Sequence, residues 1–120
     1  MKTTETLYVA SREEFRRWLA EHHRQKREIW LIFYYKSTGK ATLHYGEAVE
    51  EAICYGWIDS QLNRLDEERF VRRFTPRRGK SSWSRYNRAR ALRMLRQGKM
   101  TESGMAALPT DLLNAWQAQE

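Results

Sequence analysis

Residues 56–87 read GWIDSQLNRLDEERFVRRFTPRRGKSSWSRYN, and the expected elements of the chain are arranged around this stretch. Segments 57–65 and 69–75 read as strands around Asp66-Glu67-Glu68 and predict a β-hairpin without the Asn-Gly type of tight turn. With Leu65 opposite Phe70, one face carries Trp57, Asp59, Gln61, Asn63, Arg72 and Phe74, and the other carries Ile58, Ser60, Leu62, Arg64, Val71 and Arg73. A one-residue slip would exchange these two sets, so the register stays open.

The segment EIWLIFYYK, residues 28–36, predicts a strand inside the sheet, because it is rich in β-branched and aromatic residues and apolar on both faces. A short strand is expected at residues 7–9. Helices are expected at residues 12–22, from 45 or 46 to 55, from a cap at Ser82 or Ser84 to 97, and after Thr110. The chain is therefore predicted to be one α+β domain over residues 1–120, with residues 1–6 frayed and a small, mainly antiparallel sheet packed by about four helices.

Positive charge is concentrated in the second half of the chain. Residues 69–101 contain twelve Arg or Lys and no Asp or Glu, whereas the formal net charge of the whole chain is +7. The remaining residues therefore carry a net charge of −5. Such an asymmetry favours an anionic metabolite, an acidic protein or a nucleic acid as partner, and a solvated basic surface is the alternative interpretation.

The single cysteine and the three histidines point to no reactive centre. Cys54 alone excludes an internal disulfide, and its place near the end of a helix favours a small buried side chain over a nucleophile. The histidines show no spacing typical of metal ligands or of a Ser-His-Asp triad, so no metal, cofactor or catalytic residue is predicted. The N-terminus has no signal-peptide pattern and the apolar run at residues 29–35 is too short to cross a bilayer, which favours a cytoplasmic location.

The loop after the hairpin is the expected ligand site. Arginine supplies a planar fork for phosphate or carboxylate, and hydroxyls and a helix N-terminus add further donors. The candidate ligand-binding residues are Asp59, Arg73, Thr75, Arg77, Lys80, Ser82, Trp83 and Ser84. Asp59 is expected to pair with Arg73 or Arg77, either in a ligand site or as an anchor for the loop. The loop lacks the Walker-A pattern, so nucleotide hydrolysis is not indicated.

Three stretches carry a resemblance to a known family: GWIDSQ (56–61), RFTPRRGKSSWSRYN (73–87) and QGKMTESG (97–104). They resemble the YdeI/OmpD-associated family, also called bacteriocin-protection proteins. The likeness begins near Glu14 and extends over most of the chain; it departs at Tyr86 and in a short C-terminal end. The resemblance implies a small α+β domain linked to bacteriocin or envelope-stress tolerance, and it brings no catalytic residues with it.

Three hypotheses of function follow. The leading one is a non-enzymatic cytosolic binding module that engages an anionic small molecule or an acidic partner protein through the basic loop and the helix after it. The first alternative is a nucleic-acid-binding protein that uses Arg85, Arg90, Arg93 and Arg96. The second is an enzyme acting on a small anionic substrate with Asp59 as base, which requires one pocket holding Asp59, Arg77 and Trp83. The oligomeric state stays open.

Overall fold

The strand predicted at residues 28–36 lies inside a mixed four-stranded sheet. The computed structural model describes residues 5–79 and 81–119. Its strands are β1 (Thr6–Tyr8), β2 (Ile29–Tyr34), β3 (Trp57–Arg64) and β4 (Arg69–Pro76), in the order β1-β2-β4-β3. β1 is parallel to β2 and the other two pairings are antiparallel, so the predicted α+β fold with a mainly antiparallel sheet is confirmed.

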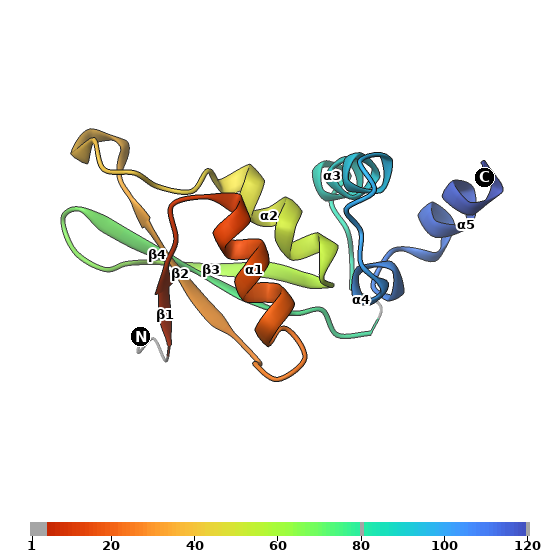
Figure 1. Ribbon diagram of the computed structural model, residues 1–120, viewed down its shortest axis with the longest axis horizontal. Coiled ribbons are helices and arrows are strands. Elements are labelled where there is room, and N and C mark those ends of the chain that lie inside the picture. Colours follow the sequence, from red (N-terminus) through yellow and green to blue (C-terminus); the bar gives the residue numbers. More distant parts are fainter. Residues whose placement is uncertain (1–4, 80, 120) are drawn as a thin grey trace.

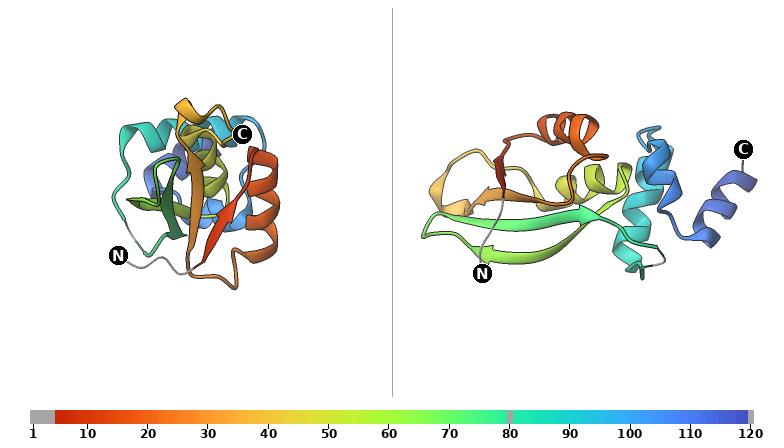
Figure 2. Two further views of the ribbon diagram at one scale, coloured as in Figure 1. Left: turned by 90° about the vertical axis from the view of Figure 1, so that its left-hand side faces the viewer. Right: turned by 90° about the horizontal axis from the view of Figure 1, so that it is seen from below.

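Two helices cover the sheet and three others lie at one end of it. The helices are α1 (Arg12–His22), α2 (Tyr45–Cys54), α3 (Arg85–Arg96), α4 (Glu102–Ala106) and α5 (Thr110–Ala118), with a short 3-10 turn at Lys36–Thr38. Figure 1 shows α1 and α2 against the sheet, and α5 at the far tip. The views in Figure 2 agree, and the extents of 48 × 26 × 26 Å describe an elongated molecule.

The cores follow the apolar stripes of the helices. Phe15 and Leu19 of α1 are fully buried against β2 and the hairpin in the larger core. A second cluster joins Val49 and Ile53 of α2 to Ala91 of α3. Because α2 contributes to both clusters, it connects the sheet to the helical end of the molecule.

The start of α3 agrees with the prediction from the sequence, whereas the start of β1 differs from it. Ser84 caps α3 by accepting a hydrogen bond from the Asn87 backbone N–H at 3.1 Å, as one of the two predicted caps required. Of the segment expected to be frayed, residues 1–4 lie outside the described residues, whereas Trp30 donates its backbone N–H to the Glu5 carbonyl at 3.0 Å and Thr6 belongs to β1. β1 therefore begins one residue earlier than the strand expected at residues 7–9.

The hairpin is present, but its register differs from the one with Leu65 opposite Phe70. The structure pairs Arg64 with Phe70, so the one-residue slip holds near the turn. Farther along, Asp59 pairs with Phe74, because Ser60 and Gln61 together lie opposite the single residue Arg73. Such a bulge adds one residue to a strand and changes which side chains share a face. Neither regular register therefore describes the whole hairpin.

Two carboxylates of α2 are buried. Glu50 and Glu51 are only 5% and 1% exposed. Arg12 and Arg16 of α1 both bond to Glu51, and Arg93 of α3 lies 3.1 Å from Glu50. Since three helices contribute charges to one cluster, α2 is held by ion pairs on this side and by apolar packing on the other.

α4 packs against the end of α2 through a glycine. The Thr101 backbone N–H donates to the Cys54 carbonyl at 3.1 Å, and a Cβ on Gly104 would collide with that carbonyl and lie 2.6 Å from the sulfur of Met100. The carbonyl belongs to main chain at the end of a helix, so it cannot move aside cheaply.

We therefore expect Gly104→Ala to lower the free energy of unfolding by about 1–3 kcal/mol. Chemical denaturation of the two proteins measures the difference. Gly46→Ala is the control, because a Cβ at Gly46 meets nothing closer than Arg90 at 3.9 Å and alanine favours a helix by about 1 kcal/mol. Equal stability of the Gly104→Ala and Gly46→Ala proteins would contradict this account of the contact.

Candidate anion-binding site

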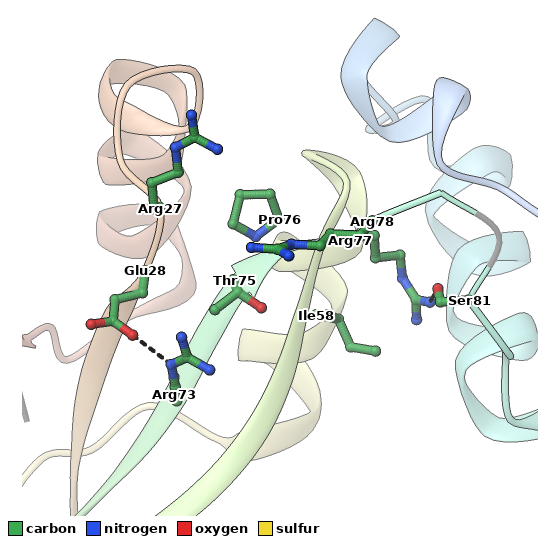
Figure 3. A pocket seen from close by; sticks show the side chains of 9 residues that line it. All are labelled: Arg27, Glu28, Ile58, Arg73, Thr75, Pro76, Arg77, Arg78 and Ser81. Atoms are coloured by element: carbon green, nitrogen blue, oxygen red, sulfur yellow. Dashed lines mark hydrogen bonds and ion pairs between the residues drawn. The ribbon is translucent and has the colours of Figure 1, made fainter.

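A basic cavity lies where the start of β2 meets the end of β4 and the loop that follows. Its volume is about 690 Å³, and Figure 3 shows its lining side chains. They are Arg27, Glu28, Ile58, Arg73, Thr75, Pro76, Arg77, Arg78 and Ser81. The cavity therefore combines four arginines, two hydroxyls and a single carboxylate.

The sheet brings these residues together. β2 and β4 are antiparallel, with Ile29 opposite Phe74, so the residues just before β2 lie beside those at the end of β4. Pro76 ends the β4 strand, and the next residue donates its backbone N–H to the Gly56 carbonyl at 2.9 Å. This bond fixes where the basic loop leaves the sheet.

Only one of the four arginines is paired with the carboxylate of the cavity. Arg73 donates from Nε to Glu28, and Figure 3 shows the two side chains facing each other from β4 and from the residue before β2. One negative charge against four positive ones leaves the lining strongly cationic. A cavity of this kind concentrates anions.

Arg77 is the most unusual side chain of the site. Its guanidinium carbon lies 3.6 Å from the centre of the Trp83 ring, and Nη1 donates to Ser81 Oγ at 2.6 Å. Nε and Nη2 are buried and have no hydrogen-bond partner among the described residues. Burial lowers the pKa of Arg77 to about 10, and the charge of Asp59 only partly opposes this shift. The arginine thus carries a positive charge and unused donors in a poorly solvated place.

The structure brings together part of the predicted set of ligand residues. Arg73, Thr75 and Arg77 line the cavity, and Trp83 lies under the guanidinium of Arg77. Ser82 is exposed in the loop outside the lining, and Ser84 is used to cap α3. Lys80 lies outside the described residues.

Asp59 does not pair with Arg73 or Arg77, so that expectation was wrong. Its carboxylate accepts a hydrogen bond from the Tyr45 hydroxyl at 2.9 Å and lies 3.6 Å from Arg72 Nη1. Asp59 lies opposite Phe74, whereas Arg73 is the adjacent residue of β4 and points to the other face of the sheet. Asp59 is not among the residues that line the basic cavity, so the arrangement required for Asp59 as a catalytic base is not formed.

The arginines of α3 do not form a uniformly free stripe. Arg93 pairs with buried Glu50, and Arg90 donates to the side chain of Asn87 at 2.9 Å. Arg85 lies over the ring of Tyr86, and Arg96 is exposed. Three of the four residues named for nucleic-acid binding therefore have contacts within the molecule.

Four polar residues of the cavity were missed by sequence reasoning: Arg27, Glu28, Arg78 and Ser81. Arg78 and Ser81 belong to the same loop as the predicted residues, so the charge of the loop was a usable signal. No local signal in the sequence marked Arg27 and Glu28, because their proximity to the loop depends on the pairing of β2 with β4. Pairing partners cannot be read from alternation alone.

Other chemistries find little support in the described residues. Cys54 is fully buried, and burial raises the pKa of its thiol to about 11, which opposes reactivity. Within residues 5–79 and 81–119 no group of three or more His, Cys, Asp or Glu could hold a metal ion. None of the helices in that part of the chain has the length and apolar character needed to cross a membrane.

Comparison with known proteins identifies one family. Residues 7–107 match the family model described as "Domain of unknown function (DUF8412)". Neither the comparison with curated proteins nor the comparison with solved structures finds a match. The matched segment runs from within β1 to just beyond the end of α4, and so includes the sheet apart from Thr6 and every lining residue of the basic cavity. The chain belongs to the DUF8412 family.

Proposed function

We propose that this protein is a binding module that holds a small anionic ligand in the basic cavity. The observation that carries the proposal is Arg77, whose buried Nε and Nη2 are without partners among the described residues. Leaving a charged donor buried and unpaired costs free energy, and a phosphate or carboxylate oxygen would satisfy it. A ligand anion would thus complete a set of contacts that the protein leaves open.

The size and charge of the cavity support a small molecule over a large partner. Its volume of about 690 Å³ is in the usual range of about 300–1,000 Å³ for small-molecule sites. Three arginines remain after Arg73 has paired with Glu28, so a ligand with more than one negative charge is favoured. The link to bacteriocin or envelope-stress tolerance and a cytoplasmic location stay predictions from the resemblance and the sequence.

Titration with pyrophosphate tests the proposal, since this probe carries several negative charges and fits the cavity. The melting temperature of the protein should rise with pyrophosphate concentration. The free energy of unfolding should increase by about 2.7 kcal/mol when the ligand concentration is a hundred times its dissociation constant. The effect should weaken at physiological salt. Potassium chloride at matched ionic strength is the control. No stabilisation by pyrophosphate beyond that of the chloride, even at low salt, would overturn the proposal.

A further inference from the structure

A second cavity of about 340 Å³ lies beside the basic one and shares Pro76 and Arg77 with it. It contains a histidine and a serine from distant parts of the chain, His23 at the end of α1 and Ser103 in α4. Their side chains are joined, with His23 Nε2 3.1 Å from Ser103 Oγ. No spacing in the sequence indicated this pair, because 80 residues separate them.

The hydrogen bonds of His23 determine which ring nitrogen carries the proton. Nδ1 lies 2.8 Å from the backbone carbonyl of Leu19, and a carbonyl oxygen only accepts. Nδ1 is therefore the donor, and in the neutral ring Nε2 is left as an acceptor. Ser103 Oγ must then donate its proton to Nε2. This is the arrangement of a nucleophile and a general base, with the Leu19 carbonyl holding the base in its tautomer.

Both side chains are carried on well-fixed backbone. α4 is capped by Thr101, whose hydroxyl accepts from the Gly104 N–H at 3.2 Å and also donates to the Cys54 carbonyl. A Cβ at Gly56 would lie 2.8 Å from the Ser103 carbonyl, so the chain approaches Ser103 closely. The ring of His23 packs against Tyr55, with centroids 5.0 Å apart. A nucleophile and a base held in this way need little reorganisation before they react.

We propose that Ser103 and His23 form a nucleophile–base pair that hydrolyses carboxylic esters carrying an anionic group. The choice of an anionic substrate rests on the proposed function, since Arg77 lines both cavities and would hold that group. Arg24 adds a second cation to the wall of the smaller cavity. The nucleophile–base pair itself rests only on the geometry of His23, Ser103 and Leu19.

The reaction balances with water as the only co-reactant. Ser103 Oγ bonds to the ester carbonyl carbon while His23 Nε2 takes the hydroxyl proton. Collapse of the tetrahedral adduct breaks the ester C–O bond, and Nε2 returns the proton to the leaving alkoxide. A water molecule then attacks the acyl carbon with Nε2 as base and breaks its bond to Oγ, which regains a proton. The products are a carboxylic acid and an alcohol.

Labelling of the wild-type protein with a neutral fluorophosphonate probe tests the pair directly. Oγ would bond to phosphorus and fluoride would leave, with the serine proton passing to solvent through His23. Peptide mapping by mass spectrometry should find the label on Ser103 when native protein is treated with the probe. It should find no label there when the protein is heat-denatured before the probe is added. Two results would overturn the proposal. One is native protein that is not labelled at Ser103, and the other is equal labelling of Ser103 in protein that was denatured before the probe was added.

Variants separate a reactive pair from a structural hydrogen bond. His23→Gln should slow labelling by about 100-fold or more, as expected for loss of a general base. His22→Gln and Ser60→Ala are matched controls, because His22 packs on Trp18 and Ser60 is exposed in the hairpin; both should label like the wild type. Equal labelling of folded His23→Gln and wild type would contradict the role of His23. If His23→Gln fails to fold, the mapping of the wild-type label still decides.

Hydrolysis of two acetate esters tests the anionic class. Native protein should prefer 4-acetoxybenzoate to phenyl acetate, and Arg77→Ala should lose this preference while Ser103 is still labelled. If Ser103 is labelled but the protein does not prefer 4-acetoxybenzoate, the proposed anionic substrate class is contradicted and the nucleophile–base pair is supported. If labelling is absent while pyrophosphate still stabilises the protein, the pair fails and the proposed function stands.

Discussion

Replacing Glu51 with alanine is expected to lower the free energy of unfolding by about 3–5 kcal/mol. The Glu51 side chain is only 1% exposed and accepts from Arg12 Nε at 2.6 Å and from Arg16 Nη1 at 2.9 Å. Removing it leaves two partly buried guanidinium groups without their main acceptor. A buried ion pair that loses one partner is destabilised by the uncompensated charge more than by the lost contact.

Urea denaturation at neutral pH measures this effect. Glu47→Ala is the matched control, because Glu47 is on the same helix but is 42% exposed and lies 3.7 Å from Arg12. An exposed pair of this kind contributes about 0–1 kcal/mol. Similar losses for the Glu51→Ala and Glu47→Ala proteins would show that the buried cluster does not hold α1 against α2 as described.

Replacing Arg77 with alanine is expected to weaken pyrophosphate binding by about 10- to 100-fold. Hydrogen bonds to charged groups contribute about 1.5–3 kcal/mol, and each 1.4 kcal/mol is a factor of ten in affinity. Stability without ligand should change by only about 1 kcal/mol, because the loss of stacking on Trp83 is offset by relief of an unpaired buried charge. Loss of binding at nearly constant stability is the specific signature of a binding residue.

Isothermal titration calorimetry gives the affinity, and thermal denaturation gives the stability. Arg17→Ala is the control, since Arg17 is an exposed arginine of α1 outside the cavity lining and its removal lowers the net charge equally. Arg77→Lys keeps the charge without the planar fork, so its affinity should lie between those of the wild type and Arg77→Ala. Equal weakening by Arg17→Ala and Arg77→Ala would mean that overall charge, and not this site, attracts the anion.

The sequence predicted the elements that depend on local pattern. The strand at residues 28–36, the helix capped by Ser84 and the hairpin around residues 66–68 all follow from alternation, capping chemistry and turn residues. The bulge at residues 60–61 was not predicted, because nothing in the alternation marks an extra residue opposite Arg73. The bulge separates the Arg64–Phe70 register near the turn from the Asp59–Phe74 register farther along.

Residues that meet only through the sheet order or through helix packing could not be predicted. Arg27 reaches the cavity because β2 pairs with β4, and Glu51 is buried because arginines of α1 lie across from it. His23 and Ser103 meet because α4 packs against the end of α2 near the end of α1. The basic loop could be predicted because its charged residues are close together in the sequence. The residues that lie beside it in the structure are distant in the sequence.

The state of the Arg77 guanidinium during a pyrophosphate titration tests the central claim most directly. Nuclear magnetic resonance of a ¹⁵N-labelled sample resolves arginine Nε–H signals, and Arg77→Ala assigns the signal of Arg77 by its disappearance. The Arg77 signal should shift and become protected from exchange with water as pyrophosphate is added, following the same binding curve as the calorimetry, while Arg17 stays unchanged. An Arg77 signal that does not respond while pyrophosphate binds would contradict the claim that this arginine, whose buried Nε and Nη2 have no partner among the described residues, forms the anion site.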